Sequence, residues 1–177
     1  MNEEIKVHDF KEQLAKTETP EAIKQEIKAI KKTWGEDVKI KPYTKDMAAQ
    51  LDYHCDYVVS CEKLGKFTVD LKQTGYPSYT CFIETVSMDT KPEEKSWFYS
   101  SVNYVLFYWK NKEHEPFCIP INHITRKFIE KCFEGKRLIT VPNRNYNTLG
   151  YVLTVKEIRM ALSLANQEQS KLTWWMK

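Results

Sequence analysis

Apolar positions recur at helical spacing near the start of the chain, in a segment that is otherwise rich in lysine and glutamate. The apolar side chains on this stripe are those of Ile23, Ile27, Ile30 and Trp34. Thr19 is a suitable N-cap, Pro20 suits the first helical position, and Gly35 provides a stop. The pattern therefore predicts an amphipathic helix over residues 20–34, with lysines on its outer face.

The middle of the chain contains apolar runs of strand length, separated by short polar segments. These runs cover residues 53–61, 67–73, 79–88, 102–109 and 116–121, after a shorter extended piece at 38–40. Short turns join the first three runs, which predicts an antiparallel meander. We expect a helix over residues 123–134, a loop over 142–149, and a last helix that opens at a capping box of Thr154 and Glu157. This order predicts an α/β (α+β) fold in which helices flank a central mixed sheet.

The composition is that of a globular protein. The chain has 177 residues, of which 42% are hydrophobic and 29% charged, and it carries a formal net charge of +3. These values predict one domain over residues 1–177, with a core over about 20–135 and a C-terminal helix and tail, 150–177, packed on it. A positive charge this small neither requires nor excludes a nucleic-acid partner.

The cysteines and the apolar runs both argue against export and membrane insertion. The five cysteines include no C-x-x-C pair, which favours reduced thiols of an intracellular protein. No apolar run approaches the ~18 residues that a membrane span needs. The N-terminal sequence MNEEIKVHDFKEQ is charged and has no signal-peptide core. We therefore expect a soluble, cytoplasmic protein without a membrane partner.

Charged residues occur inside the predicted strands, where they are rare unless paired or bound to a metal. Asp56 stands at the head of the first apolar run, Asp70 and Lys72 lie in the second, and Glu84 lies in the third. Asp70 and Lys72 project from the same face of a strand, and a hairpin with its turn near Leu64-Gly65 brings Asp56 close to Asp70. Two carboxylates suit Mg²⁺ or Mn²⁺, and a lysine beside them can polarise or deprotonate a water or steady developing charge.

The order acid, hairpin, acid-x-lysine resembles the signature of the PD-(D/E)XK nuclease superfamily, which includes restriction endonucleases and Holliday-junction resolvases. The resemblance covers roughly residues 20–110. It implies a restriction-endonuclease-like core of a helix, three strands, a helix and a further strand. It also implies a DNA endonuclease in which Asp56 and Asp70 hold Mg²⁺ and Lys72 assists the water. The stretch from Glu84 through Ser96-Trp97-Phe98 to Asn103-Tyr104-Val105-Leu106 is similar to phage-type members. Homodimerisation is expected from the resemblance alone.

Several features leave alternatives open. A glutamate on the first helix often joins the site in such nucleases, and Glu26 fits because it borders the apolar stripe; Glu84 competes for the same role. Asp52 competes with Asp56 as the first acid. The segment between the third and fourth strands is too short and polar for a long crossover helix, so the helix over 123–134 is a candidate for that role. The second acid, Asp70, reaches less far than a glutamate.

Lysines, aromatic residues and a glutamine near the hairpin are candidates for holding nucleic acid, since such side chains bind phosphates and stack on bases. These candidates are Lys63, Lys66, Gln73, Tyr76, Tyr79 and Lys95. The alternative function is a catalytically inactive nucleic-acid-binding or inhibitory protein with the same fold. A third class is a structural protein, in which Asp70 and Lys72 form a simple surface ion pair. Trp174 and Trp175 are expected to fold back on the body or to mediate self-association.

Overall fold

The computed structural model describes residues 19–43, 55–75, 78–91, 96–109, 114–143 and 145–174. It contains a five-stranded sheet of β1 (Lys39–Pro42), β2 (Tyr57–Cys61), β3 (Gly65–Thr74), β5 (Tyr104–Trp109) and β6 (Phe117–Pro120), in that order. A three-stranded sheet has the order β4 (Thr80–Val86), β8 (Asn147–Thr154) and β7 (Ile139–Pro142). The helices are α2 (Pro20–Trp34), α4 (His123–Glu130) and α5 (Val155–Trp174), with short 3₁₀ turns η1 (Trp97–Tyr99) and η2 (Lys131–Phe133). The predicted α+β fold with a mixed sheet is confirmed.

The five-stranded sheet is antiparallel except at its centre. β1 pairs with β2, β2 with β3, and β5 with β6 in antiparallel register, whereas β3 and β5 run parallel. The predicted meander is therefore correct for β2 and β3 but wrong for β4, which pairs with β8 in the other sheet. A parallel neighbour needs a long crossover, and residues 75–103 supply one. The expected loop over 142–149 is also wrong in part, because β8 begins at Asn147.

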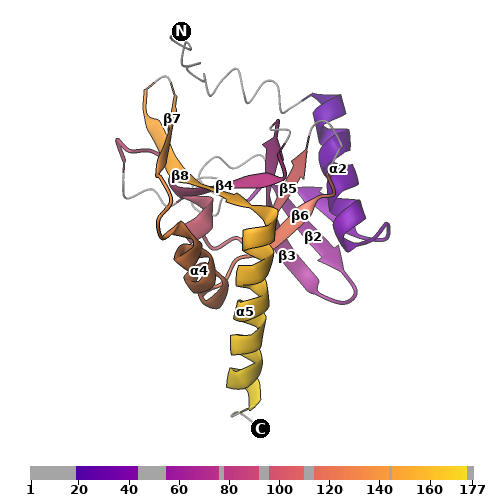
Figure 1. Ribbon diagram of the computed structural model, residues 1–177. Coiled ribbons are helices and arrows are strands. Elements are labelled where there is room, and N and C mark those ends of the chain that lie inside the picture. The colour runs from indigo at the N-terminus through magenta and orange to yellow at the C-terminus, as the bar shows by residue number, and fades with distance from the viewer. Residues whose placement is uncertain are drawn as a thin grey trace.

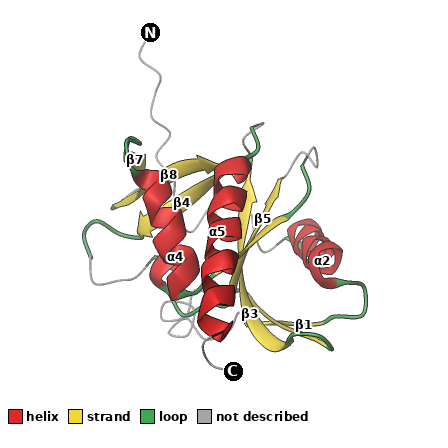
Figure 2. Cartoon of the chain, turned by 60° about the horizontal axis from the view of Figure 1, so that its bottom comes forward, coloured by secondary structure: helices red, strands yellow, loops and turns green. Residues whose placement is uncertain are grey.

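The five-stranded sheet is the middle layer of the molecule. α2 covers one face, and the three-stranded sheet with α4 and α5 covers the other (Figures 1 and 2). The side chains of β5 alternate between two cores: Leu106 packs on the α2 side, and Val105 and Phe107 pack on the side of α4 and α5. This strand is therefore buried on both faces, as a central strand next to a parallel partner should be.

α2 forms where the apolar stripe predicted it. Thr19 Oγ1 accepts a hydrogen bond of 3.2 Å from the backbone N–H of Ala22, and Gly35 ends the helix with a φ of 109°, in the region that favours glycine. Ala29 and Ile30 are buried against the sheet. These local signals fix the helix that covers the face of the sheet opposite to Asp70 and Lys72.

The predicted helix over 123–134 is shorter than expected, because α4 ends at Glu130 and continues as η2. The capping box at the start of α5 is confirmed. Thr154 Oγ1 accepts a hydrogen bond of 3.2 Å from the backbone N–H of Glu157, and Glu157 Oε2 accepts one of 2.7 Å from the backbone N–H of Thr154. Lys136 Nζ lies 2.8 Å from the other oxygen of Glu157, so this carboxylate ties α5 to the segment after η2.

Glu157→Gln is expected to lower the free energy of unfolding by about 1 kcal/mol at pH 7, through loss of the charged half of the capping box. The hydrogen bond from Lys136 and those from Thr154 lower the pKa of Glu157 to about 2, from an ordinary 4.5. A lowered pKa in the folded state stabilises the protein above pH 4.5, and this contribution is lost as the pH falls toward 2. Urea unfolding of the wild type and of Glu157→Gln should show a difference in the free energy of unfolding at pH 7 that becomes small near pH 2. Glu62→Gln, in the exposed turn after β2, should change stability by less than ~0.5 kcal/mol.

All five cysteines are free thiols, as the sequence predicted. Cys55 and Cys81 are buried, and burial raises the pKa of both thiols. Within the described parts of the chain, no helix is long and apolar enough to span a bilayer.

Candidate functional site

Asp56 and Asp70 are brought together by the hairpin of β2 and β3. Tyr57 pairs with Val69, so the same register places Asp56 opposite Asp70, one residue before β2 begins. The backbone N–H of Asp56 donates to the carbonyl of Val69 at 3.0 Å, which extends the pairing. Its carboxylate Oδ2 accepts a hydrogen bond of 2.7 Å from the backbone N–H of Leu71. The hairpin expected from the sequence thus forms, and it places the two acids opposite each other on facing strands.

Asp70 and Lys72 project from the same face of the five-stranded sheet, since they are two positions apart on one strand. They pair with Val105 and Phe107 of β5, whose side chains lie in the core on the α4 and α5 side. Lys72 Nζ lies 3.0 Å from Asp70 Oδ2. Asp70 is only 4% exposed, whereas the side chain of Lys72 is 32% exposed. The ion pair therefore runs from the interior toward the surface.

Asp70 Oδ2 retains unused capacity to bind a positive group. Lys72 Nζ is its ion-pair partner at 3.0 Å, and among the described residues no other donor is hydrogen-bonded to this buried oxygen. Burial raises the pKa of the Asp70 carboxyl well above its ordinary value, Lys72 lowers it, and the neighbouring Asp56 carboxyl raises it. Two acids this close in a dry site oppose each other's ionisation, and a divalent cation would favour the ionised form of both.

Lys72 is held by negative charge on more than one side. Burial lowers the pKa of its ammonium, but Asp70, Glu84 and Asp56 raise it, and the net shift is upward. Lys72 is therefore a fixed positive charge and a hydrogen-bond donor at neutral pH. Of the roles expected from the sequence, polarising a water and steadying developing charge fit this state, whereas deprotonating a water does not.

Glu84 approaches the site from the three-stranded sheet. It lies on β4 opposite Gly150 of β8, directly before a shift in the strand register. Its Oε1 accepts a hydrogen bond of 2.9 Å from Ser87 Oγ, and its negative charge acts on Lys72. Glu84 therefore contributes negative charge near Lys72, and its own carboxylate is hydrogen-bonded to Ser87.

Glu26 lies on the opposite face of the sheet from Asp70 and Lys72. Its Oε2 accepts a hydrogen bond of 2.5 Å from Tyr57 Oη, and its Oε1 accepts one of 3.4 Å from Tyr108 Oη. Both tyrosines belong to the core beneath α2. Burial raises the pKa of Glu26, although the Tyr57 hydrogen bond lowers it. Glu26 borders the core as predicted, but its two oxygens are engaged by tyrosines and do not face the buried carboxyl.

Asp56 and Asp70 provide two of the oxygen ligands that a divalent cation needs. Among the described residues, no group of three or more His, Cys, Asp or Glu side chains converges as a metal site. Asp56 and Asp70 supply two carboxylates, and Mg²⁺ commonly takes one or two carboxylates from a protein and keeps several waters. The feature that favours a cation at this position is the buried Oδ2 of Asp70, which has the Lys72 ammonium beside it but no hydrogen-bond donor from any other described residue.

The hairpin residues predicted to hold nucleic acid are spread along its length. Lys63 and Lys66 are exposed near the turn. Lys66 lies four residues before Asp70, which is roughly 13 Å along an extended strand. Gln73 is exposed next to Lys72 but belongs to the other face of the strand. Among the described candidates on the hairpin, Gln73 is the nearest to Lys72 along the chain, but its side chain is on the face away from the paired acids.

Tyr79 is used for packing. Its ring stacks on that of His114, with 4.5 Å between ring centroids, and its hydroxyl donates to the carbonyl of Glu115 at 3.1 Å. Four further residues singled out from the sequence lie outside the described parts of the chain: Asp52, Tyr76, Lys95 and Trp175. Trp174 ends α5.

Sequence reasoning missed three groups around these acids. The sequence places Tyr57 and Tyr108 in predicted strands without a role of their own, and in the structure their hydroxyls donate hydrogen bonds to Glu26. The available signal was tyrosine in place of an aliphatic residue on strands facing a helix that carries a glutamate, because a buried tyrosine hydroxyl needs a partner. The backbone N–H of Leu71, which holds Asp56, has no sequence signal of its own.

Comparisons of the chain with protein-family models, with curated proteins and with solved structures find no match. Its function is therefore inferred from the chemistry of the site.

Proposed function

We propose that this chain is a metal-dependent endonuclease of PD-(D/E)XK type that hydrolyses DNA phosphodiester bonds. The observation that carries the proposal is the opposed pair of Asp56 and Asp70, with Lys72 Nζ 3.0 Å from the buried Asp70 carboxylate. An acidic group buried beside another acid costs stability, and such arrangements are concentrated at sites that bind cations or react. The arrangement is poorly suited to a purely structural role.

The order of elements also supports the proposal. Helix α2 is followed by the antiparallel strands β1, β2 and β3, and β5 then adds parallel to β3. The expected nuclease core has a helix, three strands and a further strand, but its expected third strand, residues 79–88, is β4 of the other sheet. β1, β2 and β3 supply three antiparallel strands in its place. In the described part of the connection between β3 and β5, strand β4 and the turn η1 stand where the family has a helix. α4 packs with α5 on the same side of the sheet and is the candidate for that layer.

Each residue has a definite chemical role in this proposal. Asp56 and Asp70 hold Mg²⁺, which when bound neutralises charge on the phosphate and lowers the pKa of a coordinated water. The Leu71 N–H fixes the Asp56 carboxylate through the 2.7 Å hydrogen bond. Lys72 donates a hydrogen bond to the attacking water or to a phosphoryl oxygen, and Glu84 helps to keep it charged.

The second candidate is a non-catalytic nucleic-acid-binding or inhibitory protein with the same fold. The observation that favours it is the absence, among the described residues, of a third metal-ligating side chain beside the two acids. In that case the protein would keep Asp56, Asp70 and Lys72 but would bind nucleic acid without cleaving it.

A cleavage assay with the full chain separates the two candidates. Linear, nicked and branched DNA should be cut in Mg²⁺ or Mn²⁺ and left intact in EDTA. Replacing Mg²⁺ by Ca²⁺ tests whether cleavage requires the smaller cation, because Ca²⁺ also binds oxygen ligands but has a larger radius and a looser coordination geometry. Binding of DNA without cutting under all these conditions would favour the second candidate and overturn the first.

A further inference from the structure

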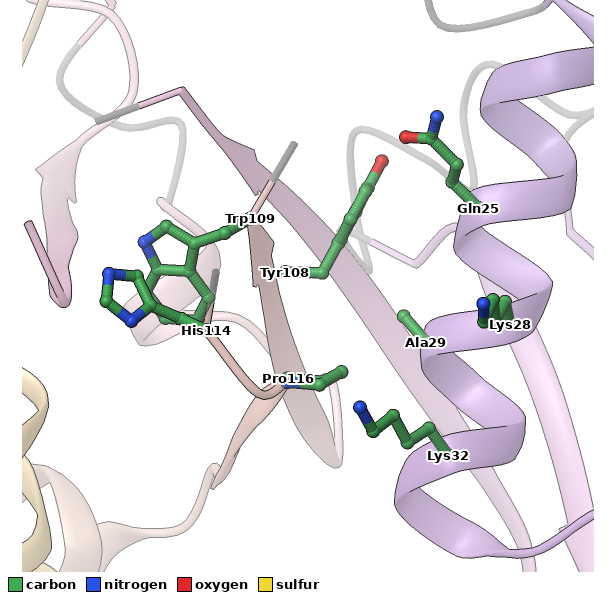
Figure 3. Close-up of a pocket in the computed structure, with 8 residues that line it drawn as sticks. All are labelled: Gln25, Lys28, Ala29, Lys32, Tyr108, Trp109, His114 and Pro116. Atoms are coloured by element: carbon green, nitrogen blue, oxygen red, sulfur yellow. The ribbon is translucent and has the colours of Figure 1, made fainter. Parts of the chain in front are cut away.

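A pocket of about 100 Å³ lies between α2 and the ends of β5 and β6. Gln25 and Lys32 reach from the helix toward Tyr108 and Pro116 on the strand side (Figure 3). Ala29, on the helix surface between them, leaves the space open. The volume exceeds that of a single water site, for which about 10–15 Å³ by the same measure suffices. It therefore has room for a small flat group.

The strand side of the pocket is aromatic and well braced. Trp109 and His114 lie beyond Tyr108, on the side away from α2 (Figure 3). The imidazole of His114 stacks on Tyr79, and the rings of Tyr79 and Trp109 meet edge to face with 4.7 Å between centroids. Tyr108 is the ring on the α2 side, so a planar, aromatic ligand would stack on it, while the rings behind it hold the end of β5 in place.

Two lysines line the pocket, and the charge of one of them, Lys32, is balanced by a carboxylate. Lys32 Nζ is paired with Glu115 Oε2 at 2.6 Å. Lys28 is exposed, and among the described residues no carboxylate pairs with it. An ammonium without a carboxylate partner among the described residues, beside an aromatic pocket, matches one nucleotide within a strand, which has an uncharged aromatic base and a phosphodiester with a single negative charge. Gln25 adds an amide that can both donate and accept a hydrogen bond at the edge of a base.

The pocket is connected to the candidate active site through side chains. The Tyr108 hydroxyl donates to Glu26 at 3.4 Å, and Glu26 also accepts from Tyr57 at 2.5 Å. Tyr57 directly follows Asp56 in the chain. The pocket lies on the α2 face of the five-stranded sheet and the paired acids lie on the other face. A strand with one nucleotide in the pocket would therefore pass the ends of β3 and β5, at Thr74 and Trp109, to reach the acids.

We propose that this pocket holds one unstacked nucleobase of the substrate strand, with its phosphate on Lys28 and its edge on Gln25. The assignment rests on the proposed nuclease function. It specifies the substrate class: DNA with at least one unpaired nucleotide, such as an overhang, a gap or a single strand. A base in a continuous duplex would have to leave the stack to reach the pocket.

The experiment measures binding in EDTA, so that it does not depend on cleavage. Fluorescence anisotropy compares a blunt duplex, the same duplex with a short single-stranded overhang, and a set of overhangs with one abasic position each. We expect tighter binding of the overhang and a loss of about 5- to 100-fold at one abasic position. Gln25→Leu should weaken binding of the intact overhang by about 2- to 10-fold and have no effect on the oligonucleotide that lacks that base.

Lys28→Ala should reduce the slope of log K against log salt by about one. Lys24→Ala is the matched control, because Lys24 is an exposed lysine on the same helix that does not line the pocket. It should leave both the slope and the abasic profile unchanged. Equal effects at Lys24 and Lys28, or overhangs that tolerate every abasic position, would overturn the pocket assignment even if the protein cuts DNA. An abasic effect without cutting in Mg²⁺ would instead overturn the nuclease and retain the pocket.

Discussion

Asp70→Asn is expected to lower metal-dependent cleavage by on the order of 10³-fold while leaving the fold at least as stable as the wild type at neutral pH. The asparagine keeps the shape of the side chain but cannot hold a divalent cation with Asp56. It also removes an ionisable group that is 4% exposed and lies beside a second carboxyl. The free energy of unfolding of the variant should therefore not be lower than that of the wild type at neutral pH.

The sign of this effect on stability follows from the direction of the pKa shift. The folded state raises the pKa of Asp70, chiefly through burial, so it binds the proton more tightly than the unfolded state does. Stability is therefore lost as the pH rises from the ordinary pKa of 3.8 through the raised value, and the full cost is present above it. The variant loses the ion pair between Asp70 and Lys72, which lowers its stability. This loss is limited because the negative charges of Glu84 and Asp56 still act on Lys72.

Thermal melts with and without Mn²⁺ measure both parts of this prediction. At 100 times the dissociation constant, a cation that binds only the folded state stabilises it by about 2.7 kcal/mol. For a chain of this size the melting temperature should rise by roughly 5–10 °C in the wild type and not in Asp70→Asn. Asp89→Asn is the matched control, since Asp89 is an exposed carboxylate bonded to Asn147 away from the paired acids. It should keep the Mn²⁺ response.

The opposite result would identify Asp70 and Lys72 as a structural ion pair. Breaking a buried pair that serves only stability costs about 3–5 kcal/mol, so Asp70→Asn would then melt well below the wild type. Absence of any Mn²⁺ response in the wild type would contradict the metal site itself.

The parts of this structure that could be predicted from the sequence are those fixed by neighbours in the chain. The stripe and caps of α2 are local, and so is the hairpin that places Asp56 opposite Asp70, because its register depends on one short turn. The pairing of acid, acid and lysine on one sheet therefore followed from spacing. The same reasoning placed Glu26 at the border of the core but could not reveal which hydroxyls it would meet.

The misplaced strand shows where local reasoning ends. β4 has the apolar alternation of a strand that could pair with β3, and the short segment between them favours that choice. Its actual partner, β8, lies far along the chain, with Glu84 opposite Gly150. Such a pairing depends on packing of both sheets around Ile83 and Leu153, and no short-range pattern encodes it. The pairing of β4 with β8 therefore places the charge of Glu84 where it acts on Lys72, and the sequence did not indicate this pairing.

Gly150→Ala is expected to be the most damaging small substitution around the candidate site. A Cβ at this position would lie 2.3 Å from the carbonyl oxygen of Ile83 and 3.0 Å from the Cα of Glu84, both in the backbone of β4. Backbone cannot turn aside as a flexible side chain can, so β4 and β8 must separate where they pair. We expect a loss of about 2–3 kcal/mol in the free energy of unfolding, which corresponds to a fall of roughly 4–12 °C in the melting temperature.

Because Glu84 would move with β4, Gly150→Ala should also loosen the support of Lys72 and reduce cleavage at temperatures where the variant remains folded. Gly75→Ala provides the control, since a Cβ there meets nothing within 4 Å and its backbone needs no left-handed conformation. That variant should stay within ~0.5 kcal/mol of the wild type and cut at the wild-type rate. Equal melting temperatures for the two variants would show that β4 and β8 are not held as closely as their pairing at Glu84 requires. The link from Gly150 through Glu84 to Lys72 would then have no structural basis.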